Sequence, residues 1–108
     1  MEEVITNNRE KCIWALKALR QVNDPEIGLN IVDLGLVYQV DFDESDQKIY
    51  LQMTLTTQFC PMGNSILEAA GLALGQAFPG YEVEVSLTFE PHWTSERIST
   101  EGKIFLNR

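Results

Sequence analysis

Cysteine is scarce in this sequence, since only Cys12 and Cys60 occur among its 108 residues. Two cysteines are too few for a disulfide scaffold and too few for a metal site built from cysteine alone. Basic residues are also few: 8 Lys and Arg stand against 16 Asp and Glu, giving a formal net charge of -8. Because an acidic surface repels phosphate backbones, we expect no nucleic-acid binding through a basic patch.

Long apolar runs are missing as well. The longest uncharged stretch, from Ile49 to Leu67, is interrupted by polar residues and by Pro61, so we expect no membrane-spanning helix. The first residues include two acids and no apolar run after a basic start, which is unlike a secretory signal. We therefore expect a cytoplasmic protein with reduced thiols and no membrane partner.

What remains is the composition of one globular domain. Hydrophobic residues make up 44% of the chain and charged residues 22%, close to the average for such domains. The length leaves room for one hydrophobic core. We therefore predict that residues 1–108 form a single domain, with its core over about 8–102.

Helical periodicity first appears after Asn7. Asn7 and Glu10 have the spacing of a capping box, so the pattern predicts a helix over 8–21 with Asn7 as its N-cap. Cys12 lies on the apolar stripe of this helix. We therefore expect its thiol to be packed in the core.

A second helix is predicted after Cys60 and ends before Pro79. Its start has two interpretations: Pro61 suits a first helical position, whereas Ser65 resembles an N-cap. We favour the earlier start. Near the end of the chain, Ser95 is expected to cap one short helix that stops before Gly102.

Three segments alternate between apolar and polar residues, as strands with one buried face do. They span residues 36–42, 49–55 and 81–89. A polar turn joins the first two into an antiparallel hairpin, and the uncharged second strand is expected in the centre. The predicted fold is α+β in two layers, in the order α-β-β-α-β plus a short C-terminal helix. Both main helices cover one face of a three-stranded mixed sheet with strand order 1-2-3.

Cys60 is the candidate reactive residue, because ligands collect beyond a strand that leads into a helix. A thiol at a helix N-terminus meets unpaired N–H groups and the positive end of the helix dipole. Both favour the thiolate, which is the nucleophile and the ligand of soft metals. The hydroxyls of Thr56 and Thr57 are predicted to donate hydrogen bonds to a bound anion or sulfur. The alternative is that Cys60 is a buried, inert residue.

Two acids and one imidazole are the other candidates. Asp24 and Glu26 flank a proline, and carboxylates at this spacing can hold a cation or share a proton. Alternatively, Asp24 forms an ordinary turn at the end of a helix. His92 is the only histidine, and we expect it to be a packing or surface residue.

The stretches DPEIGLNIVDLGLVY, MTLTTQFCP and EPHW together resemble the PaaD-like and SufT-like family of small iron–sulfur cluster assembly proteins. The resemblance covers about residues 10–102. It implies an α+β fold and a role in assembling iron–sulfur clusters or delivering them to recipient proteins. Asp33 matches the DLG motif of the family, but we expect its role to be structural. The site residues that it implies are Asp24, Glu26, Thr56, Thr57 and Cys60.

This chain departs from the family pattern both before and after Cys60. Gln58 and Phe59 stand where many relatives carry small residues, which makes the loop before Cys60 bulkier. No cysteine follows Cys60, whereas some PaaD-type members carry a cysteine-rich C-terminal extension. A PaaD-type role in one specific oxygenase is therefore not expected.

An iron–sulfur cluster usually needs four thiolate or equivalent ligands, which one Cys60 cannot supply. We therefore expect no tightly bound cofactor, and at most iron or a labile iron–sulfur cluster shared between two chains as a homodimer. The expected partners are the iron–sulfur assembly machinery and recipient apo-proteins.

These observations favour an accessory maturation factor over a turnover enzyme, with Cys60 as a transient ligand of the metal, the cluster or the client. Two alternatives stay open. One is a thiol-dependent transferase or hydrolase, in which Cys60 is the nucleophile and His92 the base. The other is an interaction module in which Cys60 is inert.

Overall fold

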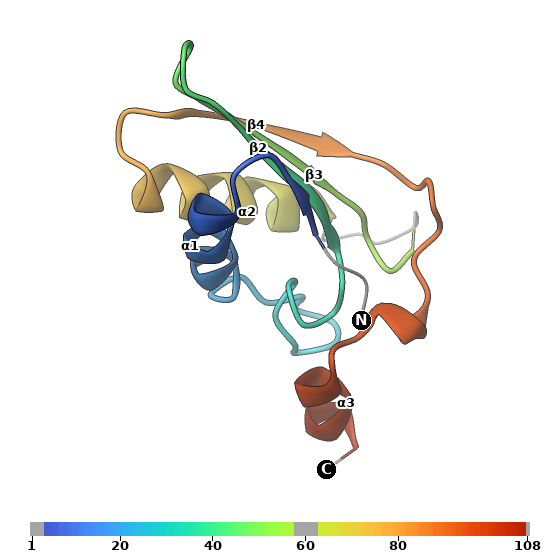
Figure 1. Ribbon diagram of the computed structural model, residues 1–108. Coiled ribbons are helices and arrows are strands. Elements are labelled where there is room, and N and C mark those ends of the chain that lie inside the picture. Colours follow the sequence, from blue (N-terminus) through green and yellow to red (C-terminus); the bar gives the residue numbers. More distant parts are fainter. Residues whose placement is uncertain (1–3, 58–62, 108) are drawn as a thin grey trace.

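The computed structural model describes residues 4–57 and 63–107. Its elements follow one another as β1 (Ile5–Thr6), α1 (Arg9–Leu19), β2 (Val37–Asp43), β3 (Lys48–Met53), α2 (Gly63–Ala77), β4 (Glu82–Leu87), the 3-10 turn η1 (Ser95–Arg97) and α3 (Thr100–Leu106). The helices α1 and α2 cover one face of the sheet, whereas α3 stands apart from both layers (Figure 1). The predicted α+β arrangement in two layers is thereby confirmed. Among the described residues, no helix has the length and hydropathy that a membrane crossing needs.

The described strands form one sheet in the order β1-β2-β3-β4. β2 and β3 pair antiparallel, and β3 and β4 pair parallel, as predicted for the three longer strands. The prediction of three strands missed β1, which pairs parallel to β2 through Ile5 and Thr6. Two residues are too short to show an alternating pattern, so the sequence carried no signal for this strand.

The N-cap of α1 is Asn8 and not Asn7. The Asn8 side chain accepts a hydrogen bond from the Lys11 N–H at 3.1 Å, which satisfies one of the free donors of the first turn. The Asn7 side chain instead donates to the Phe42 carbonyl and accepts from the Phe42 N–H, both at 2.9 Å. Asn7 therefore fastens the N-terminal segment to β2, a long-range role that its neighbours in the sequence do not reveal.

Within the described residues α2 begins at Gly63, so Ser65 lies inside the helix and its interpretation as the start is wrong. The favoured start at Pro61 lies outside the described residues. Gly71 faces the sheet, and a Cβ there would lie 3.3 Å from Val85 Cγ2. The absence of a side chain at Gly71 thus lets α2 approach β4 closely.

The segment between α1 and β2 belongs to the core although it has no helix or extended strand. Ile31, Leu34 and Leu36 are fully buried in it, and each such side chain contributes about 1.5–3 kcal/mol through burial. Backbone hydrogen bonds hold the segment, among them Ile31 N–H to Val22 O and Leu36 N–H to Ile31 O. This well-packed loop carries both the DPEI and the DLG stretches.

The C-terminal elements differ from the prediction. Ser95 begins the 3-10 turn η1, and the cap of α3 is Ser99, whose Oγ accepts from the Gly102 N–H at 3.0 Å. Gly102 lies within α3 and does not end a helix. The expected cap is wrong because Ser95 and Ser99 offer the same local signal, and contacts of Ser99 with Asp33 select between them.

Candidate functional site

The carboxyl ends of β3 and β4 meet at one edge of the sheet, where the segment that leads to Cys60 begins. Met53 pairs with Leu87, and the Thr88 N–H donates to the Met53 carbonyl at 2.9 Å. β3 continues into residues 54–57, and the chain is described again at the N-terminus of α2. Cys60 itself lies outside the described residues. The expected order of strand, cysteine segment and helix is confirmed, whereas the exposure and reactivity of the thiol stay predictions.

Three threonines lead from β3 toward Cys60. Thr54 is fully buried, and its N–H donates to the Leu36 carbonyl at 2.8 Å. Thr56 is half-buried and Thr57 is exposed. The bond between Thr54 and Leu36 joins the TLTT stretch to the end of the DLG stretch, so two motifs that are distant in the sequence meet here.

A buried tyrosine lies beside these threonines and was not recognised as a site residue from the sequence. The Tyr38 hydroxyl donates to the Pro91 carbonyl at 2.9 Å, and the Arg97 guanidinium lies 4.4 Å from the centroid of the Tyr38 ring. Burial raises the pKa of Tyr38, while the charge of Arg97 and a hydrogen bond with Thr54 oppose this rise. Tyr38 is therefore a neutral phenol that connects the start of the site to the C-terminal segment.

Asp33 fastens the C-terminal segment to the motif loop. Its Oδ1 accepts from Ser99 Oγ at 3.0 Å, and its Oδ2 accepts from Asn30 Nδ2 at 2.7 Å. The Asp33 carbonyl also accepts the Ser99 N–H at 2.7 Å. A carboxylate with two such partners is a strong structural link, and the structural role expected for Asp33 is confirmed.

Gly35 permits a close approach of the same two segments. Its φ is +79, and an added Cβ would lie 2.6 Å from the Arg97 Cβ. Nearby, the Trp93 indole N–H donates to the Leu34 carbonyl at 2.6 Å. These contacts hold Arg97 over the Tyr38 ring and explain why the DLG stretch requires glycine at its third position.

Asp24 and Glu26 have different environments although they lie two residues apart. Asp24 is 1% exposed, and its Oδ1 accepts the N–H groups of Glu26 at 2.9 Å and Ile27 at 3.3 Å. The Asp24 N–H donates to the Leu29 carbonyl at 2.9 Å, whereas Glu26 is exposed. Asp24 therefore forms the turn that the alternative interpretation anticipated. Whether either acid contacts a ligand stays a prediction.

The loop between α1 and β2, which contains Asp24, contacts the site through Leu36 at its C-terminal end. The hydrogen bonds described for Asp24 stay within its own turn, and the link to the threonine segment is the bond from Thr54 to Leu36. The structure thus brings the DLG stretch directly to the site. The DPE stretch lies farther along the same packed loop.

The remaining candidates divide clearly. Cys12 is 5% exposed, and burial raises the pKa of its thiol, so it is the core thiol that was predicted. His92 is exposed, in agreement with the surface interpretation. Its distance to Cys60 lies outside the described residues, so the pairing of nucleophile and base stays a hypothesis.

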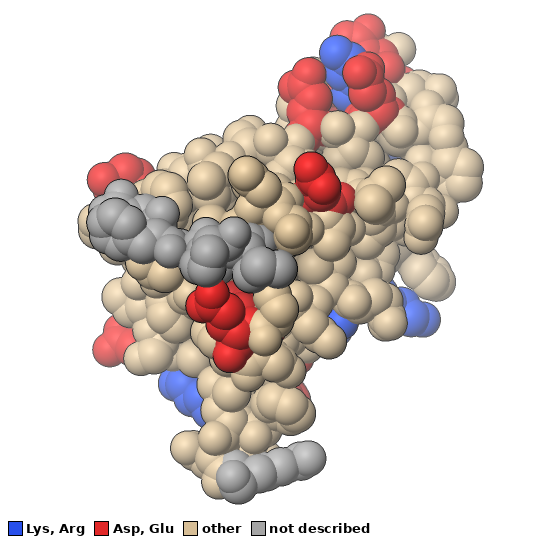
Figure 2. Space-filling model, turned by 180° about the vertical axis from the view of Figure 1, so that it is seen from behind, with Lys and Arg blue, Asp and Glu red and all other residues tan. Residues whose placement is uncertain are grey.

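Carboxylates, cysteines and histidine do not converge in the described part of the chain. No group of three or more such side chains there can hold a metal ion. On the face opposite the view of Figure 1, acidic side chains stand singly or in small groups, and no continuous basic area is visible (Figure 2).

Known proteins match both the sequence and the fold. The family described as iron–sulfur cluster assembly protein matches residues 15–87. The chain is 40% identical over 106 residues to the Fe-S protein maturation auxiliary factor YitW of Bacillus subtilis, covering 98% of this chain and 97% of that protein. It is 39% identical to the Fe-S protein maturation auxiliary factor SufT of Staphylococcus aureus, over 79% of this chain and 96% of that protein.

A solved structure shows the same architecture. The crystal structure of a DUF59 domain from Bacillus anthracis superposes with a TM-score of 0.81 at 36% sequence identity, covering 93% of this chain and 98% of that one. The family expected from the DPEI, DLG and TLTTQFCP stretches is thus confirmed. The chain belongs to the iron–sulfur cluster assembly protein family, and its role is that of an accessory factor in the maturation of iron–sulfur proteins.

Proposed function

We propose that Cys60 performs this accessory role as a transient ligand for iron, for an iron–sulfur cluster, or for the cluster of a client protein. The observation that carries the proposal is the position of its segment, which leaves the carboxyl end of β3 and leads to the N-terminus of α2. Free N–H groups and the helix dipole at such a position stabilise a thiolate. The metal or cluster is cargo in this proposal, and it leaves with the recipient protein.

The number of available thiols makes the complex a shared one. Cys12 is enclosed in the core, so each chain offers one cysteine to the cargo. A cluster needs about four ligands, and the others then come from a second copy of this chain, from the recipient apo-protein or from the assembly machinery. Sharing keeps the cluster labile, as delivery requires. We place this exchange in the cytoplasm, where thiols stay reduced.

The surrounding residues have separate tasks in this proposal. The hydroxyls of Thr56 and Thr57 donate hydrogen bonds to a sulfur or an anion bound at Cys60. Glu26 is exposed and offers an oxygen ligand, while the buried Asp24 fixes the turn that presents it. Tyr38 acts through position alone, because its ring and hydroxyl hold the start of the threonine segment against the C-terminal segment.

The direct test is client maturation in cells that lack this protein and are supplied with a variant chain. Cys60→Ser is expected to lower the activity of an iron–sulfur recipient enzyme to that of cells without the protein. Cys12→Ser, a substitution in the core, serves as the control, with the soluble amount of each variant measured alongside. Full maturation with Cys60→Ser would remove the thiol from the mechanism.

Thiol labelling separates the accessory role from the module with an inert cysteine. In the folded protein, iodoacetamide is expected to modify Cys60 rapidly and Cys12 only after unfolding, because burial protects Cys12. A folded chain that resists modification at both cysteines would favour the inert module. His92→Gln separates the accessory role from the enzyme alternative, in which His92 is the base. Because His92 has no task in the accessory role, His92→Gln is expected to leave maturation unchanged, and a loss of maturation would favour the enzyme.

A further inference from the structure

β4 has an open hydrogen-bonding edge. It is the last strand in the order β1-β2-β3-β4, and within the described residues β3 is its one strand neighbour (Figure 1). The N–H groups of Glu82 and Thr88 point toward β3, where they donate to Gln47 and Met53. Backbone groups of a strand alternate between its two edges. The backbone N–H and C=O groups of Val83, Val85 and Leu87 therefore point away from β3, toward the open edge.

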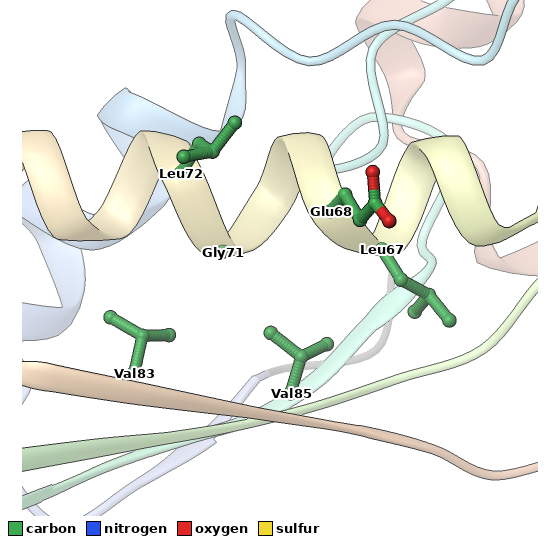
Figure 3. A pocket seen from close by; sticks show the side chains of 6 residues that line it. All are labelled: Leu67, Glu68, Gly71, Leu72, Val83 and Val85. Carbon is green, nitrogen blue, oxygen red and sulfur yellow. The ribbon is translucent and has the colours of Figure 1, made fainter.

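An apolar groove of about 510 Å³ lies along this open edge, on the side of the sheet that α2 covers. Val83 and Val85 point from β4 toward α2, and Gly71 presents no side chain above them (Figure 3). Leu72 is 68% exposed beside the groove. The residues that line it are Leu67, Glu68, Gly71, Leu72, Val83 and Val85.

Acidic side chains accompany the groove. Glu82 and Glu84 are exposed and alternate with the valines, so they lie on the opposite face of β4 from the groove. Lys48 approaches Glu82 at 3.9 Å, and the Glu82 side chain remains 71% exposed. Glu68 adds a third carboxylate at the groove itself. The edge thus presents apolar surface on one face and negative charge on the other.

We propose that this edge binds an extended segment of a partner protein in which aliphatic residues alternate with lysine or arginine. Added to β4, such a strand pairs with the outward N–H and C=O groups of Val83, Val85 and Leu87. Every second side chain then enters the groove beneath α2, and the side chains between them lie beside Glu82 and Glu84. Successive side chains of a strand point to opposite faces, so one bound strand can place its aliphatic side chains in the groove and its basic side chains beside Glu82 and Glu84.

The same charges disfavour a second copy of this chain as the occupant. Pairing of one β4 with another places Glu82 and Glu84 against identical carboxylates, and like charges directly opposite one another destabilise paired strands. The net charge of -8 adds to this repulsion. The residues that carry the inference lie in α2 and β4, and none of them has a task in the proposed function, so the inference does not depend on that proposal.

The test uses a short fluorescent synthetic peptide of alternating valine and lysine, with a valine–glutamate peptide of equal length as its control. Fluorescence anisotropy is expected to show saturable binding of the basic peptide alone. In an NMR titration, the amides of Val83, Val85 and Leu87 are expected to shift most and to become protected from hydrogen exchange. The Cys60→Ser chain is expected to bind the peptide equally well.

Charge reversal provides the matched comparison. Glu82→Lys with Glu84→Lys is expected to weaken binding of the basic peptide about tenfold or more and to confer binding of the acidic one. Glu10→Lys with Glu101→Lys changes the net charge equally on α1 and α3 and is expected to retain binding. If both double variants lost peptide binding equally, net charge alone would explain the effect, and the proposed binding site at β4 would be wrong.

A substitution in the groove tests the apolar half. Leu72 is 68% exposed, so Leu72→Ser is expected to leave the fold intact. It is expected to weaken peptide binding several-fold, because it removes apolar surface from the groove. Unchanged binding by Leu72→Ser, or NMR shifts away from β4, would contradict the proposal. Self-association in sedimentation equilibrium that Leu72→Ser abolishes would assign the groove to a second copy and would also overturn it.

Discussion

Neighbouring residues of the DPE stretch have opposite environments. Asp24 is enclosed and accepts two backbone N–H groups, whereas the Glu26 side chain faces solvent. Removing one partner of a buried hydrogen bond leaves the others unsatisfied, which costs far more than removing an exposed group. At the scale of single residues, the structure therefore separates groups that hold the loop from groups available to a ligand.

Asp24→Ala is expected to lower the free energy of unfolding by about 1–3 kcal/mol, because the N–H groups of Glu26 and Ile27 lose their acceptor. Urea unfolding monitored by circular dichroism measures this change. Glu26→Ala is the matched control and is expected to alter stability by less than about 0.5 kcal/mol. Equal effects of the two substitutions would contradict the structural role of Asp24.

Gly28 and Gly35 provide a second matched pair, because both have positive φ values, of 82 and 79. An added Cβ meets nothing within 4 Å at Gly28 but collides with Arg97 at Gly35. Gly28→Ala is therefore expected to cost about 1–2 kcal/mol through backbone strain alone. Gly35→Ala is expected to cost about 2–5 kcal/mol in total, because overpacking adds to the strain.

Thermal unfolding of the two glycine variants measures the difference. The fluorescence of Trp93 provides a second observable, since Gly35→Ala also moves the segment whose indole donates to Leu34. If Gly28→Ala and Gly35→Ala had equal stabilities, the close approach of Gly35 to Arg97 would not limit the size of the residue at position 35.

Three elements meet at Lys11, which lies on α1. Its ammonium donates to Glu44, in the turn between β2 and β3, and to the Tyr81 hydroxyl that precedes β4. It also lies 5.9 Å from the centroid of the Phe42 ring. Tyr81 Oη donates to Glu44 at 2.8 Å and completes the triangle. At the scale of elements, this polar cluster joins the helical layer to the end of the hairpin farthest from the site.

Acidification is expected to weaken this junction. Hydrogen bonds from Lys11 and Tyr81 hold the pKa of Glu44 below its ordinary value of 4.5. A carboxylate with a lowered folded pKa contributes stability above its unfolded pKa, and that contribution is lost as the pH falls through the folded value. The stability difference between wild type and Glu44→Gln is therefore expected to stay constant near neutral pH and to shrink below about pH 4.5. Urea unfolding at several pH values checks this, and a difference that is independent of pH would contradict it.

Most elements could be predicted from periodicity, and the two misplaced caps have a common cause. The cap of α1 was placed at Asn7 because Asn7 and Asn8 are locally equivalent, and only the pairing of Asn7 with Phe42 separates them. Ser95 and Ser99 differ likewise through the contact of Ser99 with Asp33. Local patterns carry no information about partners that are far away in the sequence, and such partners decided both positions.

One part of the candidate site, the threonine segment, could be predicted from the sequence, whereas the contact between Tyr38 and Arg97 could not. The threonine segment before Cys60 follows from the order of strand, loop and helix together with the motifs. Tyr38 and Arg97 had no signal, because an aromatic residue in an amphipathic strand reads as core and a single arginine near the end of a chain reads as surface. Their contact at 4.4 Å arises from the tertiary structure alone.

At the scale of the whole molecule, a small acidic chain carries two cysteines, of which Cys12 is buried in the core. Anaerobic reconstitution with iron, sulfide and an exogenous thiol is expected to give an absorbing species that sediments as a dimer. In the proposed arrangement two chains each supply Cys60, and the exogenous thiol or carboxylates such as Glu26 complete the four ligands. Chelation of the iron is expected to return monomers. Cys12→Ala is expected to retain the species and Cys60→Ser to lose it. A cluster on a monomeric chain would contradict the shared arrangement.

The bonds between the DLG loop and the C-terminal segment also set an order on biosynthesis. Tyr38 is separated from Pro91 by 53 positions, Leu34 from Trp93 by 59 and Asp33 from Ser99 by 66. A chain growing on the ribosome can therefore pair its strands and pack both main helices before these bonds exist. The tyrosine beside the threonine segment is covered only after Pro91 and Arg97 have emerged. Ribosome-bound chains that stop before Trp93 are thus expected to lack the bonds that Trp93 and Ser99 make to Leu34 and Asp33, and with them the final form of the site.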